Sequence, residues 1–339
     1  MVPIVLFLCI PDSNKPIGGV KQIYKHAESI CSFGRQAFVV TEKPGFKPSW
    51  FSSAAKTISF EEIFAHESIN FSTTILVLPE TYVTHDLSNY RGHDLSGYSY
   101  VIFNQNVYFT FQGLNTNSAL SVIHNFYRSA NMLQVLTVSS DNLLFIANIL
   151  GVDEGRISRI IHGIGAGFES SNSKENIITW MPRKNRVEAA KVLTSIDCGR
   201  SHCFEKWHIL ALDNISHDEV ALHLNKSKIF LSFGHPEGFG LPIAEAMASG
   251  CWVIGYSGIG GDELFEFGAS TKVNYGDWSN FVSGVNSVIE KLTIPSREFD
   301  DLLAHQSREV KSIYSVENEA MSIKTAWERI LAKFNSSND

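Results

Sequence analysis

Residues 232–263 read SFGHPEGFGLPIAEAMASGCWVIGYSGIGGDE, and this stretch decides the fold. The apolar run IFLSF at 229–233 predicts a buried strand, and WVIGY at 252–256 predicts a second one. Between them a glycine-rich turn leads into a helix. Proline is tolerated in the first turn of a helix, because the N–H groups there have no partner within the helix, so Pro242 is compatible with the start of this one. Gly250 marks the end of the helix. A strand, turn, helix and strand in this order are typical of a parallel α/β sheet.

The turn before this helix has the composition of a ligand-binding backbone. Gly238 and Gly240 allow the main chain to approach a ligand closely. The amides from Phe239 to Leu241 would then point outward at a helix N-terminus. Such a terminus binds anions and hydroxyl groups, so we predict that these four residues contact a substrate.

Two glutamates flank the turn and predict different roles. Glu237 follows a parallel strand at its carboxyl end, where open α/β sheets bind their ligands. Glu245 lies one turn inside the helix and faces the same crevice, where a carboxylate would accept hydrogen bonds from a vicinal diol such as that of ribose. The alternative is that both are solvated charges beside an ordinary turn. The agreement of the glutamates with the GFGLP turn, the AEAMASG helix and the later GIGG favours a binding site.

The composition suits an enzyme built from two α/β domains. The chain has 339 residues, 44% of them hydrophobic, and a formal net charge of −7, which is unfavourable for a nucleic-acid binder. Its apolar runs have strand length, well short of the roughly 18 to 20 residues of a membrane span. We expect the opening VPIVLFLCI to be a first strand rather than a signal peptide. The five cysteines predict reduced thiols in the cytoplasm.

The order of predicted elements indicates two doubly wound sheets. Strands alternate with amphipathic helices up to about residue 166, and a polar segment at 167–176 is the predicted linker. A second alternating series occupies 175–315. The last helix, 316–339, follows Ser315 as its N-cap.

Taken together, these motifs resemble the donor-binding signature of GT-B glycosyltransferases of family four, which move a sugar from a nucleotide diphosphate. The resemblance implies an α/β fold of two Rossmann-like domains facing a cleft, with the last helix crossing back to the first domain. It implies a hexosyltransferase that acts with retention on a saccharide, a glycolipid or another hydroxyl acceptor, as in polysaccharide biosynthesis. It also implies a cytoplasmic enzyme that uses no cofactor or metal beyond its nucleotide-sugar donor, with room for peripheral membrane contact.

The same resemblance assigns residues outside the central stretch. Gly18 and Gly19 would approach the donor phosphate or sugar, unless they form only a tight strand-to-helix turn. Arg183 and Lys184 would bind the pyrophosphate, where cations are needed, unless they belong to the basic first turn of an exposed helix beginning near Lys184. The backbone around Asn214 and Ile215 would read the base, before a helix capped by Ser216 and Glu219.

In the first domain, the segment VIFNQNVYFTFQG at 101–113, where a strand ends, departs from the family. Relatives carry histidines there, whereas this chain has Asn104, Gln105 and Asn106, and amides cannot act as general bases. A retaining mechanism needs no such base, and we place Asn106 with Glu237 at the reacting sugar. The aromatic residues at 108–111 are either core or a sugar-stacking platform. Glu80, at another strand end, is expected to be a surface charge rather than an acceptor ligand.

Other clusters predict no further chemistry. His162 is expected to be a structural residue near the hinge, and the Cys and His residues between 198 and 208 match no common zinc spacing. Two alternatives remain open: a GT-B nucleotide-sugar epimerase, and a non-catalytic nucleotide-sugar-binding subunit of a polysaccharide assembly. A dehydrogenase is disfavoured because neither half contains the dinucleotide-binding fingerprint.

Overall fold

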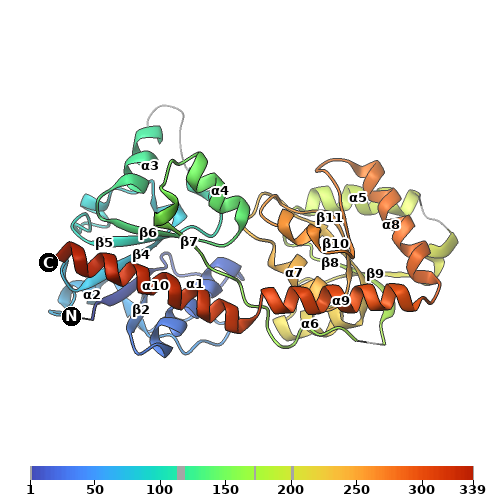
Figure 1. Ribbon diagram of the computed structural model, residues 1–339, viewed down its shortest axis with the longest axis horizontal. Helices are drawn as coiled ribbons and strands as arrows, with labels where there is room; N and C mark the ends of the chain where they lie inside the picture. The colour runs from blue at the N-terminus through green and yellow to red at the C-terminus, as the bar shows by residue number, and fades with distance from the viewer. Residues whose placement is uncertain (1, 113–118, 172, 200–201, 339) are drawn as a thin grey trace. The chain divides into compact units, whose positions relative to one another are not determined.

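The computed structural model describes residues 2–112, 119–171, 173–199 and 202–338. The chain divides into two compact units (Figure 1). The first contains residues 1–161 and 319–339, and the second contains residues 162–318. Each unit is built around its own parallel β-sheet and its own hydrophobic core.

The first unit has a seven-stranded sheet in the order β3-β2-β1-β4-β5-β6-β7, with every neighbouring pair parallel. Its central strands are continuous apolar runs because helices cover both faces of such a sheet. The chain order reverses between β1 and β4, which marks the carboxyl ends of these two strands as a ligand-binding edge. The strands are β1 (Ile4–Leu8), β2 (Gln36–Thr41), β3 (Thr57–Ser59), β4 (Thr74–Pro79), β5 (Ser99–Phe103), β6 (Met132–Thr137) and β7 (Ile157–Arg159).

Helices and short 3₁₀ segments connect these strands. Ser59 and Glu62 form a capping box at the start of α2, and Ser139 caps α4. The connecting elements are α1 (Gly18–Ser32), α2 (Phe60–Ala65), η1 (Glu80–Tyr82), η2 (Leu87–Asn89), η3 (Val107–Phe111), α3 (Ala119–Arg128), α4 (Ser140–Asn148) and η4 (Glu154–Arg156).

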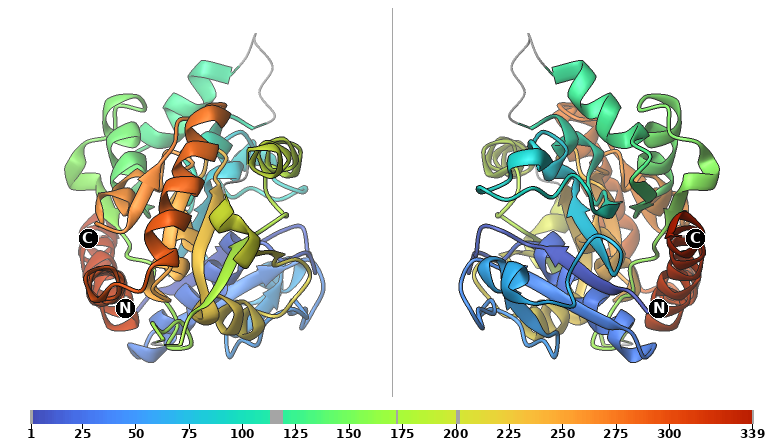
Figure 2. Two further views of the ribbon diagram at one scale, coloured as in Figure 1. Left: turned by 90° about the vertical axis from the view of Figure 1, so that its right-hand side faces the viewer. Right: turned by 90° about the vertical axis from the view of Figure 1, so that its left-hand side faces the viewer.

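The last helix, α10 (Val316–Asn338), returns the chain to the first unit from Glu319 onward. Figures 1 and 2 show it in dark red against this unit. The Trp327 indole donates a 2.8 Å hydrogen bond to Nε2 of the buried His26, and Lys25 pairs with Glu319 at 2.8 Å. The expected return of the last helix to the first domain is therefore confirmed, as is its start, where Ser315 Oγ accepts from the Asn318 amide at 3.0 Å.

The second unit has a five-stranded parallel sheet in the order β12-β11-β10-β8-β9. Its strands are β8 (Glu175–Trp180), β9 (His208–Ala211), β10 (Ser227–Phe233), β11 (Trp252–Tyr256) and β12 (Ser270–Lys272). Its helical elements are α5 (Arg186–Cys198), η5 (His202–Lys206), α6 (His217–Lys226), α7 (Leu241–Ala248), η6 (Asp262–Glu266), α8 (Trp278–Thr293) and α9 (Arg297–Ile313).

Two local expectations differ from the structure. Helix α5 begins at Arg186 rather than near Lys184, because Asn185 adopts a left-handed conformation with φ of 54° and interrupts the chain. Arg183 and Lys184 are therefore loop residues after β8, not part of a basic first helical turn. The segment 167–176 lies inside the second unit, since the two units divide between Ile161 and His162.

Candidate functional site

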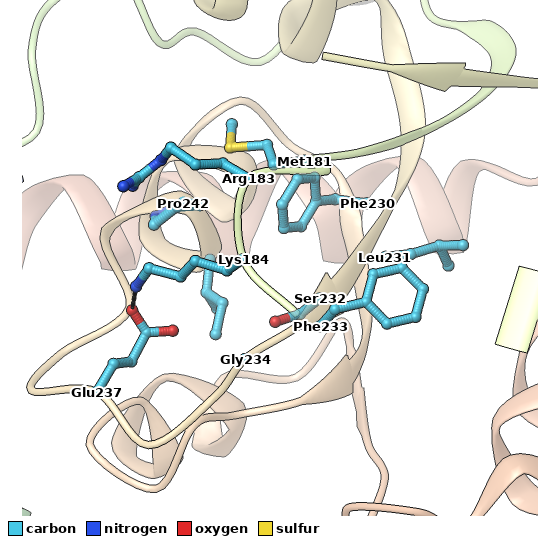
Figure 3. Close-up of a pocket in the computed structure, with 11 residues that line it drawn as sticks. Met181, Arg183, Lys184, Phe230, Leu231, Ser232, Phe233, Gly234, Glu237 and Pro242 are labelled. Carbon is cyan, nitrogen blue, oxygen red and sulfur yellow. Dashed lines mark hydrogen bonds and ion pairs between the residues drawn. The ribbon is translucent and has the colours of Figure 1, made fainter. Parts of the chain in front are cut away.

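A pocket lies at the carboxyl ends of β8 and β10 in the second unit (Figure 3). Arg183 and Lys184 reach it from the loop after β8, and Glu237 reaches it from the turn after β10. The remaining lining residues come from the position directly after β8, from β10 and the residue after it, and from the start of α7. They are Met181, Phe230, Leu231, Ser232, Phe233, Gly234, Pro242 and Ile243.

Lys184 and Glu237 form a direct ion pair in this pocket (Figure 3). The Glu237 side chain is only 12% exposed, whereas that of Lys184 is 39% exposed. A carboxylate that is largely removed from water requires such a partner. The pair also holds the lysine ammonium group at the pocket, where an anionic ligand would meet it.

The backbone of Glu237 is held by the loop after β11. Its amide donates a 2.9 Å hydrogen bond to the carbonyl of Gly258. A Cβ atom placed on Gly258 would lie 2.8 Å from Glu237 Cγ, and one on Gly260 would lie 2.2 Å from the Glu237 carbonyl oxygen. The glycines of the GIGG motif are therefore needed because the two turns touch through their backbones.

The GFGLP turn begins α7 in the way its glycines predict. Gly240 has a φ of 89°, in the left-handed region, and is the N-cap of the helix. It provides no side chain to cap the first turn, and residues 238–240 are themselves buried. Phe239 is buried, and its ring packs 5.5 Å from that of His162 and 5.0 Å from that of Tyr314. The Phe239 side chain is thus not available to a ligand, and His162 is a core residue.

Glu245 lies on α7 outside the lining of this pocket, and it has a partner that the sequence did not suggest. Oε1 of Glu245 lies 2.8 Å from Nε2 of His217, the first residue of α6. The loop before His217 contains Asn214, which has a φ of 54°, and Ile215. Loop and glutamate are therefore linked through the His217 side chain.

The cap of α6 is the one expected. Ser216 accepts from the amide of Glu219, and Glu219 accepts from the amide of Ser216. Arg186 binds Asp213 at 2.7 Å, away from Arg183 and Lys184. Arg183 and Lys184 thus line the pocket, whereas Arg186 pairs with Asp213.

At the edge of the first unit, Gly18 and Gly19 form the first turn of α1. The side-chain amide of Gln105 donates a 3.1 Å hydrogen bond to the carbonyl of Gly19, and a Cβ atom on Gly19 would lie 3.4 Å from the same amide. A Cβ atom on Gly18 would meet nothing within 4 Å. The absence of a side chain is therefore relevant to packing at Gly19 alone.

The turn at 104–106 is held by its own amide side chains. Asn104 donates to the Tyr127 hydroxyl at 2.7 Å and to the Thr110 hydroxyl at 3.0 Å. Asn106 is buried, and its Oδ1 accepts from the amide of Tyr108 at 3.1 Å, which caps η3. Gln105 is the partly exposed residue of the three. The structure thus gives Asn106 a capping role, and its placement at the reacting sugar stays a prediction.

The aromatic side chains that follow the turn at 104–106 are more open. Phe109 is 48% exposed and Phe111 is 36% exposed, while Tyr108 packs partly against the core of the first unit. The rings at 108–111 were expected to be either core residues or a sugar-stacking platform. Only Tyr108 among them packs against the core.

Glu80 is buried rather than on the surface, so the expectation of a surface charge was wrong. It is 5% exposed, and Oε2 accepts a 3.1 Å hydrogen bond from the backbone amide of Gln105. Burial raises the pKa of this carboxyl to about 7, against the opposing effect of backbone hydrogen bonds. The sequence placed Glu80 at a strand end, but the turn at 104–106 whose backbone binds it is about 25 positions away in the chain.

Metal-binding and membrane-spanning features were also sought. In residues 2–112, 119–171, 173–199 and 202–338, no three His, Cys, Asp or Glu side chains gather as metal ligands would. Over the same residues, none of the helices combines the length and the hydropathy that crossing a bilayer requires. The five cysteines carry free thiols.

Comparison with known proteins finds a family similar to part of the second unit. Residues 203–298 match the family described as Glycosyl transferases group 1. This match covers part of the second unit. The match includes Asn214, Ile215, both glutamates and the GIGG loop, but neither Arg183 nor Lys184.

A curated relative and several solved structures extend the comparison. The chain is 34% identical over 82 residues to an alpha-1,6-glucosyltransferase of Actinobacillus pleuropneumoniae serotype 7; the match spans 23% of this chain and about a quarter of that protein. A glycosyltransferase from Rickettsia africae has a TM-score of 0.70 at 16% identity, covering 97% of this chain and 99% of the other. Sucrose-phosphate synthase from Thermosynechococcus elongatus has a TM-score of 0.69 at 13% identity, with the same coverage.

A third solved structure carries a nucleotide. Anabaena HepE, in complex with UDP, has a TM-score of 0.68 at 13% identity and covers 98% of this chain and 100% of the other. At these identities the structures show the fold alone, which is the predicted GT-B arrangement of two parallel-sheet α/β domains.

Proposed function

We propose that this protein transfers a hexosyl group from a nucleotide diphosphate sugar to a hydroxyl of a saccharide or glycolipid acceptor, with retention of configuration. The observation that carries the proposal is the pocket in which Arg183, Lys184 and Glu237 meet at the carboxyl end of a parallel sheet. Two cations and a carboxylate are the groups that a diphosphate leaving group and a developing oxocarbenium ion require.

The donor fits the polarity of this site. Its diphosphate would lie against Arg183, Lys184 and the first turn of α7, where the helix dipole favours negative charge. Its ribose would bind to Glu245, and its base would lie on the backbone at Asn214 and Ile215. Its sugar would face Glu237, whose carboxylate either binds the sugar hydroxyls or stabilises positive charge at the anomeric carbon.

The chemistry needs no separate base on the protein. In a front-face reaction, the departing phosphate oxygen takes the proton of the acceptor hydroxyl while the glycosidic bond forms on the same face. Lys184 and Arg183 would stabilise the charge that grows on this oxygen. This scheme accommodates a first unit in which the amide side chains of Asn104 and Asn106 serve to hold a turn.

UDP-glucose is the donor to test first. HepE forms complexes with UDP and with UDP-glucose, and the curated relative is named a glucosyltransferase. A thermal-shift comparison of UDP-, GDP-, dTDP- and ADP-glucose should show one donor that stabilises the protein, by roughly 2.7 kcal/mol at a concentration one hundred times its Kd.

Turnover of the selected donor would then be followed by release of the nucleotide diphosphate, and the anomeric configuration of the product by NMR. We expect a product with the configuration of the donor. An inverted product would contradict the retaining mechanism. Failure of every nucleotide sugar to bind would contradict the function.

A further inference from the structure

His217 and Glu245 form a hydrogen-bonded pair in the second unit, although 28 positions separate them. The Nε2–Oε1 distance is 2.8 Å, the Glu245 side chain is 12% exposed and that of His217 is 47% exposed. An ionised carboxylate has no proton to donate, so the imidazole is the donor and carries its hydrogen on Nε2. One face of the pair therefore lies against protein and the other is open to a ligand.

The orientation of His217 is restrained from two sides. The ring of Phe168, which is 1% exposed, packs edge-on against the imidazole with 5.1 Å between ring centres. The capping box of Ser216 and Glu219 holds the first turn of α6, on which His217 is the first residue. A restrained His217 side chain can hold Glu245 in place before a ligand binds. The two side chains then lose little conformational freedom on binding.

We infer that His217 is a positioning residue for the ribose of the nucleotide. By donating to Oε1 it holds the Glu245 carboxylate in one rotamer, with Oε2 directed to accept the vicinal ribose hydroxyls. The inference rests on the proposed function, because it takes Glu245 as the ribose ligand. It adds His217 to the proposed nucleotide site. His217 lies between the loop at Asn214 and Ile215, which is proposed to bind the base, and Glu245, which is proposed to bind the ribose.

The test compares each nucleoside diphosphate with its 2′-deoxy counterpart, because only the ribo form offers the diol. Dissociation constants of UDP, GDP and ADP, and of the three 2′-deoxy forms, would be measured by calorimetry on the full chain. The variants are Glu245→Ala, His217→Ala and His217→Gln. His223→Ala is the matched control, since His223 lies on the same helix, whereas the hydrogen bond to Glu245 comes from His217.

We expect the parent protein to prefer the ribo form of its nucleotide by about tenfold or more, the scale of hydrogen bonds to a charged acceptor. Glu245→Ala should abolish this preference, and His217→Ala should reduce it to about threefold or less. His217→Gln keeps an N–H donor and should restore most of it, and His223→Ala should leave it unchanged. Thermal unfolding of each variant would show that the fold is retained.

The outcomes separate the two proposals. If Glu245→Ala abolishes the preference and His217→Ala leaves it at the parent value, the positioning role of His217 is refuted while the ribose site stands. If no nucleotide binds, or if Glu245→Ala has no effect, the donor site itself is refuted and this inference with it.

Discussion

Lys184 and Glu237 form an ion pair that joins the loop after β8 to the turn after β10. The lysine is 53 positions from the glutamate, and the pair exists because the two parallel strands end side by side. In the proposed reaction the two partners have separate targets, the diphosphate for Lys184 and the sugar for Glu237. Binding of the donor would therefore exchange one ion pair for two charge contacts to the ligand.

We predict that Glu237→Gln lowers kcat by on the order of a hundredfold, the scale of losing one preorganised electrostatic partner. The substitution keeps the shape and removes the charge. Nucleotide diphosphate affinity should stay nearly intact, because Lys184 remains available to the phosphates. Steady-state kinetics and calorimetry measure the two quantities, with the exposed Glu266→Gln as the control. Turnover at the parent rate would remove Glu237 from the reaction.

Arg183→Ala should weaken binding of the nucleoside diphosphate by about tenfold to a hundredfold, because a charge-assisted contact to phosphate is lost. Binding of the nucleoside should change little. Arg186→Ala is the matched control, since Arg186 pairs with Asp213 instead of lining the pocket. Equal losses for nucleoside and diphosphate would move the phosphate site elsewhere, to Lys184 or to the Gly18-Gly19 turn.

Gly260→Ala should cost about 1 to 3 kcal/mol of unfolding free energy, the usual range for overpacking. The added methyl would lie 2.2 Å from the Glu237 carbonyl oxygen, and backbone atoms cannot move aside as a flexible side chain can. Donor affinity should fall as well, because the turn carrying Glu237 must shift. Denaturant unfolding tests the first effect and calorimetry the second. Gly165→Ala, whose methyl would meet nothing within 4 Å, should behave like the parent protein.

Glu80→Gln should change how stability depends on pH. Burial raises the pKa of the Glu80 carboxyl to about 7 in the folded protein, so the folded state binds a proton more tightly than the unfolded chain. The stability that this proton contributes is complete below the unfolded pKa of roughly 4.3 and is lost as the pH rises through 7. The loss amounts to at most about 4 kcal/mol.

The Gln variant has no such proton, so its unfolding free energy should fall less than that of the parent protein between pH 5 and pH 8. Urea unfolding across this range measures the difference. Glu67→Gln, at an exposed position, should follow the parent curve. Parallel curves for Glu80→Gln and the parent would show that Glu80 titrates as an ordinary carboxyl.

Much of the fold could be predicted because its signals are local. The runs that form β10 and β11 are continuous apolar stretches, which only a buried strand or helix tolerates, and Gly240 and Gly250 mark the ends of the helix between them. The capping box of Ser216 and Glu219 was readable for the same reason, since three positions separate its members. The start of α5 could not be predicted in this way. It depends on the left-handed backbone conformation of Asn185, which is set by the surrounding structure, and no helix-breaking residue such as proline marks the position in the sequence.

The sequence by itself determined the α/β class, the two sheets and the glutamates around the glycine turn, since each depends on residues within one strand–turn–helix unit. Only the tertiary structure decided which groups meet: Lys184 with Glu237, His217 with Glu245, and the backbone amide of Gln105 with the buried Glu80 carboxylate. The last of these reversed the sequence-based expectation for Glu80. The physical reason is that hydrogen bonding and burial depend on distance in space, and a parallel sheet brings together strand ends that are tens of residues apart in the chain.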